Sequence, residues 1–237
     1  KVRDCSGALV IADNPNLKNI DAIKDITKVE GFWIINNNNL ERLPNFYNLD
    51  KIYGQNTSTN LIMDNDNLLS LKGLDSIRSF GRFDIINNPR LKSLDGLQGL
   101  KDFRGTSDLI VWMDIAENDS LVSITGLEGL DSLFASQSAT HGNLYVRNNP
   151  LLENVDALSN LKYIEGDLFI TNNPKLDNVN GLAELRTVKR NVVIENNSSL
   201  ASLYGLDSLD YTSFNSLTIS NCEILSFCSV KSVCHAL

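Results

Sequence analysis

Histidine and cysteine, the side chains that most often perform catalysis or bind transition metals, are few in this 237-residue chain. The two histidines, His141 and His235, are four repeat units apart in the repeat described below, too far to share a site. No Gly-x-Ser-x-Gly nucleophile motif and no glycine-rich phosphate loop is present. The sequence therefore predicts no catalytic residue and no cofactor.

Carboxylate pairs offer two other kinds of chemistry, because oxygen ligands bind Ca²⁺ and paired acids cleave glycosidic bonds. Two pairs flank an asparagine: Asp64 and Asp66 around Asn65, and Glu117 and Asp119 around Asn118. The first run lacks the glycine and the distal glutamate of an EF-hand loop. No pair is singled out as lying ~5–10 Å apart across a groove, as a glycosidase requires. We expect solvated corners, no metal site and no enzyme, with a polysaccharide-degrading solenoid as the least favoured alternative.

The four cysteines lie only near the ends of the sequence, and we take them as disulfide candidates in terminal caps: Cys5, Cys222, Cys228 and Cys234. Disulfide-stapled caps indicate an oxidising compartment, so we expect a secreted, extracellular or cell-surface protein. Buried free thiols are the alternative. The six-residue steps between the last three cysteines lack the close spacing of a zinc site. The sequence begins at Lys1 without an initiator methionine and reads as a piece of a longer precursor.

Charge and hydrophobicity exclude further classes. The formal net charge is −8, which disfavours nucleic acid and anionic membrane surfaces as partners. No run approaches the ~20 apolar residues that a membrane-spanning helix needs, so we expect no membrane insertion.

An internal repeat determines the predicted fold. In the unit that spans residues 166–188, the apolar residues are two apart at first and then three apart, as Leu168, Ile170, Leu176, Val179, Leu182, Leu185 and Val188. A two-residue period is that of a short strand, whereas a three-residue period suits 3₁₀ turns or extended segments. Nine such units can be laid along the sequence, and a stack of them buries apolar edges that no single unit can bury.

One column of the repeat is polar, and its members form a predicted structural ladder: Asn14, Asn37, Asn65, Asn88, Asn118, Asn149, Asn173 and Asn197. The ninth unit carries Cys222 at this position. Asparagine at the end of eight successive strands predicts stacked amides that satisfy backbone groups of the turns.

The run Gly-x-Leu-x-Ile-x-Asn-Asn-Pro-x-Leu-x-x-Leu resembles the receptor L-domain-like leucine-rich family, and the closing segment 225–237 is similar to the end of secreted surface proteins from Bacteroidota-type bacteria. The expected fold is mainly β: a right-handed leucine-rich solenoid of about nine 23–25-residue coils with one parallel sheet, an asparagine ladder and cysteine-containing caps. We expect a single domain over residues 1–237, with caps at 1–8 and 215–237. The resemblance implies a binding module, since related coils form ligand-binding lobes of receptors.

The outward positions of the strands are unusually apolar for a solvated sheet face, which predicts an interface. The candidate partner-binding residues are Trp33, Ile35, Leu61, Met63, Tyr145, Arg147, Phe169 and Val193. Cover by a neighbouring domain of the same polypeptide, and the simple strand preference of such residues, are the two alternatives.

Three of the repeat spacings are longer than the others, and the extra residues fall just before a strand, at 53–59, 104–112 and 134–143. In a solenoid such insertions project from one edge, where binding residues often reside. The candidate residues of this loop edge are Tyr53, Asn56, Trp112 and His141.

We therefore predict an extracellular binding or adhesion module that presents a rigid strand face and a three-loop edge to a protein partner. The alternative is a carbohydrate-binding surface, on which Trp33, Tyr145 and Phe169 would stack against sugar rings.

Overall fold

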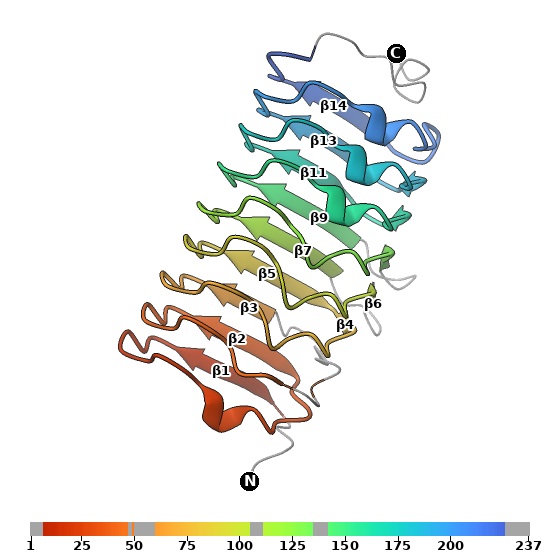
Figure 1. Ribbon diagram of the computed structural model, residues 1–237. Helices are drawn as coiled ribbons and strands as arrows, with labels where there is room; N and C mark the ends of the chain where they lie inside the picture. The colour runs from red at the N-terminus through yellow and green to blue at the C-terminus, as the bar shows by residue number, and fades with distance from the viewer. Residues whose placement is uncertain (1–6, 47–48, 50–59, 105–110, 135–141, 226–237) are drawn as a thin grey trace.

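The computed structural model describes residues 7–46, 49, 60–104, 111–134 and 142–225. Nine parallel strands lie side by side, one per coil, and form a continuous sheet that runs the length of the solenoid (Figure 1). The predicted mainly β solenoid is confirmed. In sheet order the strands are β1 (Ala8–Ala12), β2 (Gly31–Ile35), β3 (Asn60–Met63), β5 (Arg82–Ile86), β7 (Val111–Ala116), β9 (Gly142–Arg147), β11 (Leu168–Thr171), β13 (Asn191–Glu195) and β14 (Ser216–Ser220).

Neighbouring coils pair residues that are equivalent in the repeat. Ile34 of β2, for example, pairs with Ile62 of β3, which in turn pairs with Ile85 of β5. We call the part of each coil that leads from the end of one strand back to the start of the next the return segment. All three isoleucines are fully buried, because alternate residues of each strand point into the interior between the sheet and the return segments. The core is thus one continuous apolar column shared by all coils.

The return segments follow the three-residue period. In the coil after β9, the amide of Leu158 donates to the carbonyl of Val155 at 2.9 Å, and the amide of Leu161 donates to Leu158 at 2.9 Å. Each such bond spans three residues, which brings every third side chain to the core. Four coils form a 3₁₀ turn here, as predicted: η1 (Asp21–Ile23), η2 (Asp156–Leu158), η3 (Asn180–Leu182) and η4 (Tyr204–Leu206).

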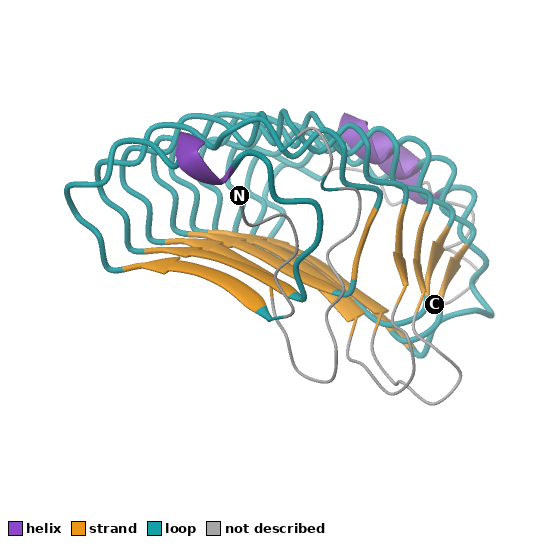
Figure 2. Cartoon of the chain, turned by 90° about the horizontal axis from the view of Figure 1, so that it is seen from below, coloured by secondary structure: helices purple, strands orange, loops and turns teal. Residues whose placement is uncertain are grey.

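A second sheet of five short strands, which the sequence analysis did not predict, lies on the side of the coils opposite the asparagine corner (Figure 2). It forms because the return segments of successive coils run parallel and end on an inward apolar residue, such as Phe80, Leu133, Ile164 or Val188, so their backbones come into pairing distance. In sheet order its strands are β12 (Thr187–Val188), β10 (Tyr163–Ile164), β8 (Ser132–Phe134), β6 (Asp102–Arg104) and β4 (Ser79–Phe80).

The asparagine ladder is confirmed at the corner that follows each strand. The side-chain amide of Asn118 donates to the carbonyls of Ile85 and Ala116, each at 2.9 Å, and its Oδ1 accepts the backbone N–H of Asn88 at 3.0 Å. The same bonds recur in neighbouring coils, and Asn118 is fully buried. These amides satisfy backbone groups that would otherwise be buried without partners.

A second ladder, missed in the sequence, lies one residue earlier. All nine residues there have left-handed backbones, with φ between 51° and 59°: Asp13, Asn36, Asp64, Asn87, Glu117, Asn148, Asn172, Asn196 and Asn221. Asparagine and aspartate tolerate this conformation best among residues with a side chain, which explains the residue type in eight of the nine coils. Several of these side chains also bond to each other, as where Nδ2 of Asn87 donates to Asp64 at 2.7 Å.

The ninth rung of the ladder is a cysteine, Cys222, one of the four disulfide candidates. Cys222 is a free thiol, whose Sγ lies 3.5 Å from the carbonyl of Ser220 and 4.0 Å from that of Ile194. It therefore takes the place that the asparagine amide has in the other coils. The other cysteines, Cys5, Cys228 and Cys234, lie outside the described residues, as does most of the two predicted caps.

Candidate functional site

The outer face of the nine-stranded sheet, called the strand face below, carries columns of side chains in register. No described element covers this face, because the return segments all lie on the other side of the sheet (Figure 2). The first column is Val10, Trp33, Leu61, Asp84, Asp114, Tyr145, Phe169, Val193 and Thr218. The second is Ala12, Ile35, Met63, Ile86, Ala116, Arg147, Thr171, Glu195 and Ser220.

Both columns are apolar over the first coils. Val10 is 50% exposed, and its neighbours Trp33 and Leu61 are half-buried. The N-terminal apolar patch, as we name it, consists of Val10, Ala12, Trp33, Ile35, Leu61, Met63 and Ile86. This patch contains four of the eight predicted partner-binding residues, which the structure thus brings together on one surface.

Charged side chains interrupt the apolar column in the middle of the sheet. Asp84 is almost fully buried, and both of its oxygens are occupied. Its Oδ2 accepts two hydrogen bonds from the Arg82 guanidinium, at 3.0 and 2.7 Å, and its Oδ1 accepts the indole N–H of Trp112 at 2.7 Å. Burial raises the pKa of Asp84 above its usual value, although the bonds from Arg82 and Trp112 oppose that rise.

A second ion pair lies beside the first. Arg147 donates two hydrogen bonds to the Asp114 carboxylate, at 3.1 and 2.8 Å, in the fork geometry that suits a guanidinium. Hydrogen bonding to Asp114 is the main cause that raises the pKa of Arg147. The Glu117 carboxylate lies 3.9 Å from Nη1 of Arg147, which is too long for a hydrogen bond.

Two aromatic side chains flank this second pair, and each is supported from behind. The guanidinium of Arg82 lies 3.7 Å from the ring centroid of Trp112, a cation–π contact. The Tyr145 ring packs against Phe169 with 5.2 Å between centroids, and its hydroxyl accepts a 2.8 Å hydrogen bond from Asn143. Burial raises the pKa of the Tyr145 hydroxyl, so it stays protonated at neutral pH.

A hollow of about 280 Å³ opens between these groups on the strand face, and we call it the central hollow. Its lining residues are Trp112, Asp114, Tyr145 and Arg147. Trp112 and Asp114 come from β7, whereas Tyr145 and Arg147 come from β9, so two adjacent strands supply all of the described residues that line it.

The two central carboxylates do not form a catalytic pair. Asp84 and Asp114 are direct cross-strand neighbours, and the raised pKa of Asp84 is a property that a general acid would need. Asp84 is only 2% exposed, however, and its hydrogen-bond partners already occupy both of its oxygens. A carboxyl group that no substrate can reach cannot protonate a glycosidic oxygen.

The loop-edge prediction is corrected at Trp112. We expected this residue in an inserted loop, but it belongs to β7 and pairs with Asn143 of β9. Strands β7 and β9 extend two residues further toward the insertions than the repeat pattern indicated, because backbone pairing between them continues to Val111 and Gly142. The other predicted loop residues, Tyr53, Asn56 and His141, lie outside the described residues.

Two of the four carboxylates that were considered for calcium accept hydrogen bonds within the structure itself. Asp64 accepts the side-chain amide of Asn87, and Asp66 accepts that of Asn38. Among the described residues, no group of three or more His, Cys, Asp or Glu side chains is placed to hold a metal ion. Within the same residues, no helix is both long and apolar enough to cross a bilayer.

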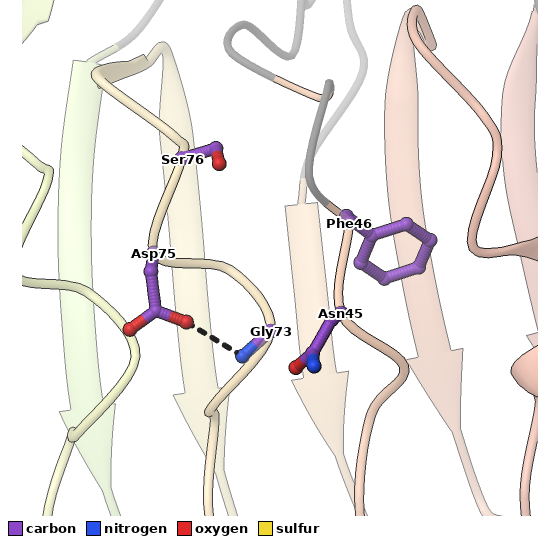
Figure 3. A pocket seen from close by; sticks show the side chains of 5 residues that line it. All are labelled: Asn45, Phe46, Gly73, Asp75 and Ser76. Carbon is purple, nitrogen blue, oxygen red and sulfur yellow. Dashed lines mark hydrogen bonds between the residues drawn. The ribbon is translucent and has the colours of Figure 1, made fainter.

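A second hollow, of about 290 Å³, lies on the return segments rather than on the strand face (Figure 3). It is lined by Asn45, Phe46, Gly73, Asp75 and Ser76. The Asp75 carboxylate accepts the backbone N–H of Gly73 at 2.8 Å, so its role there is to hold a turn.

Sequence analysis missed Arg82, Asp84, Asp114 and Asn143 as members of a site. A signal was present, because Arg82 and Asp84 are two residues apart on one strand and must share a face. The pairing of Asp114 with Arg147 depends on the exact register of strands that are separated by an insertion, and the sequence does not specify that register.

A family model described as Receptor L domain matches residues 3–98, 114–209 and 137–232 of the chain. The second and third matches overlap and are offset by 23 residues (137 − 114), close to the length of a regular coil. No curated protein and no solved structure matches the chain significantly.

Proposed function

The chain belongs to the receptor L domain family, a family of binding domains, and from this premise we propose that it is an extracellular adhesion module. In this proposal residues 1–237 form one solenoid domain, and its strand face binds a protein partner. The observation that carries the proposal is the N-terminal apolar patch, which lies in register on a face that no described element covers.

Burial of this patch would supply the binding energy. Apolar surface that leaves water contributes roughly 25 cal/mol per Å² before the costs of association are subtracted. Trp33 is the expected anchor, because large aromatic side chains near the centre of an interface dominate its energetics. Phe169 and Val193 continue the apolar column on the far side of the central hollow and would widen the contact.

The rim of the patch indicates the charge of the partner. Three carboxylates of the left-handed column, Asp13, Asp64 and Glu117, border the strand face at the ends of their strands. The chain also carries a net charge of −8. We expect a partner with a basic rim around an apolar centre, whose association rate falls as salt concentration rises.

The test begins with photo-crosslinking on the surface of living cells, where an adhesion module would meet its partner. A photoreactive amino acid replaces Ile35 on the strand face or, as a control, Tyr204 on the return segments, which is 60% exposed. We expect one protein to crosslink from Ile35 and not from Tyr204. Crosslinking from Tyr204 alone would place the interface on the wrong side of the solenoid and contradict the proposal.

The crosslinked protein is then purified, and its affinity for the chain is measured directly. Trp33→Ala is expected to weaken binding by about tenfold or more, since anchor truncations typically cost over 1 kcal/mol. Tyr204→Ala is the matched control, and both variants should melt close to the wild-type temperature. Equal affinity of the wild type and Trp33→Ala for the purified partner would reject the strand face as the binding surface.

A further inference from the structure

The central hollow has properties that the apolar patch lacks and that point to a small ligand of its own. Trp112 and Tyr145 are diagonal neighbours on adjacent strands, with the hollow between them. Arg82 holds Trp112 from one side, and Phe169 holds Tyr145 from the other. Two aromatic walls are therefore fixed before any ligand arrives, which lowers the entropic cost of binding.

The charges of the hollow exclude ionic ligands. Asp114 would attract a cation, but Arg147 neutralises it through two hydrogen bonds. Arg147 would attract an anion, but it is occupied by Asp114 and lies 3.9 Å from the carboxylate of Glu117. A ligand that enters the hollow meets polar groups with little net charge, so a neutral polar molecule fits best.

Hydrogen-bonding capacity remains for such a ligand. Each oxygen of Asp114 accepts one bond from Arg147 and keeps a further lone-pair position. Nη1 of Arg147 still has donors to offer, because Glu117 is beyond hydrogen-bonding distance. Acceptors and donors thus lie side by side at the base of the hollow, an arrangement that suits hydroxyl groups on adjacent carbons.

We propose that the central hollow binds one residue of a neutral saccharide. The C–H faces of the sugar ring would pack on Trp112 and Tyr145, while adjacent hydroxyls bond to Asp114 and Arg147. A volume of about 280 Å³ lies just below the usual range of ~300–1,000 Å³ for small-molecule sites, so one ring rather than several occupies it. None of the four residues that line the hollow belongs to the N-terminal apolar patch, so saccharide binding does not depend on the protein interface proposed above.

The two tryptophans of the chain, Trp33 and Trp112, allow a selective test. In Trp33→Phe the sole indole is in the hollow, whereas in Trp112→Phe the sole indole is in the apolar patch. Both variants are titrated with neutral gluco-, manno-, galacto- and xylo-oligosaccharides, and with uronate oligosaccharides as charged counterparts. We expect at least one neutral oligosaccharide to shift the emission of Trp33→Phe and none to shift that of Trp112→Phe.

Calorimetry with the responding oligosaccharide then assigns the contacts. Tyr145→Ala and Arg147→Met should each weaken binding by about tenfold or more, and Asp114→Asn, which keeps the shape of the side chain, should weaken it as well. Tyr204→Ala, on the exposed return segments, should leave the affinity unchanged. A change from about 50 to about 500 mM NaCl should alter the affinity less than about twofold, since no ion pair forms with the ligand.

Three outcomes would overturn the proposal: no response to any neutral oligosaccharide, a response to uronates only, or a hit whose affinity Tyr145→Ala and Arg147→Met leave unchanged. Insertion of a side chain of the protein partner into the hollow would be recognised separately. In that case Tyr145→Ala would weaken protein binding, and no saccharide would shift the tryptophan emission of Trp33→Phe. Loss of protein binding in Trp33→Ala with saccharide binding intact would show the two functions to be independent.

Discussion

At the corner where the strands end, coil after coil uses the same residue with the same hydrogen-bond partners, whereas on the strand face the chemistry changes along the sheet. Asn88, Asn118 and Asn149 each donate to two backbone carbonyls at 2.9 to 3.0 Å. The strand-face residues four positions before them in the chain are Asp84, Asp114 and Tyr145. A residue type that recurs along the coils is required for their stacking, which is common to all of them. A position that varies is not constrained by stacking and is available for binding.

The largest effect should follow from the loss of a buried rung. Asn118→Ala removes the acceptor for the N–H of Asn88 and the donor for the carbonyls of Ile85 and Ala116. We expect a loss of about 2–4 kcal/mol in the free energy of unfolding, because each buried polar group without a partner costs roughly 1–3 kcal/mol. Urea denaturation measures it. Asn14→Ala, at the exposed first rung, is the control and should cost much less; equal losses would show that burial does not set the value of a rung.

The burial of Asp84 should make the free energy of unfolding depend on pH. Burial raises the pKa of Asp84 in the folded chain above its ordinary 3.8. The folded state then holds its proton more tightly than the unfolded state, so the contribution of Asp84 to stability is fullest below pH 3.8 and falls as pH rises through the raised pKa. Relative to Asp84→Asn, the wild type should lose stability across that window. A difference that is flat with pH, or that grows, would contradict the burial argument.

The exposed left-handed ladder should have a smaller effect. Asn87→Ala loses the 2.7 Å hydrogen bond to Asp64 and places an alanine at φ 51°. The expected cost is about 1–2 kcal/mol, most of it from the backbone conformation. Asn87→Gly loses the same hydrogen bond but tolerates that conformation, so it should cost less than alanine in thermal or urea unfolding. If glycine proved as costly as alanine, the side-chain bonds rather than the backbone would dominate this column.

The smallest effect should be a gain. Cys222→Asn extends the buried ladder to the ninth coil, where an amide would reach the carbonyls of Ile194 and Ser220 that the thiol now approaches at 4.0 and 3.5 Å. We expect about 0.5–1 kcal/mol of added stability, the net value of a typical hydrogen bond. The measurement is made with and without a reducing agent. A loss of stability that appears only without reductant would mean that this cysteine forms a disulfide after all.

Sequence reasoning succeeded where the physical demand repeats. The apolar positions recur along all nine coils and the ladder asparagine in eight of them, so the pattern is clear even where a single coil departs from it. The left-handed column was equally periodic but was missed: only Asp64 and Glu117 were considered, as possible metal ligands, and the column was not recognised as a series of backbone conformers. Aspartate and asparagine in such a position are a backbone signal.

The central hollow could not be predicted for a different reason. It depends on Trp112, which follows an insertion, and the residue at which a strand begins after an insertion is set by pairing with its neighbours. Only once β7 and β9 are aligned do Asp114 and Arg147 lie close enough to bond. A site that occurs only once in a repeat protein cannot be inferred by comparing its sequence with the equivalent positions of other coils.

The uniform corner also bears on how such a chain changes in length. From Asn88 to Asn197, each buried rung after the first accepts the backbone N–H of the rung before it, so the four junctions between these coils are alike. Duplication or excision of a whole coil in this part of the stack, cut at the rung, leaves the same hydrogen bonds at the junction. The family model likewise matches the chain twice with an offset of 23 residues, close to the length of a regular coil. Recombination can therefore lengthen or shorten the molecule while the hydrogen bonds between coils stay the same. Each such change would bring new pairs of strand-face residues together.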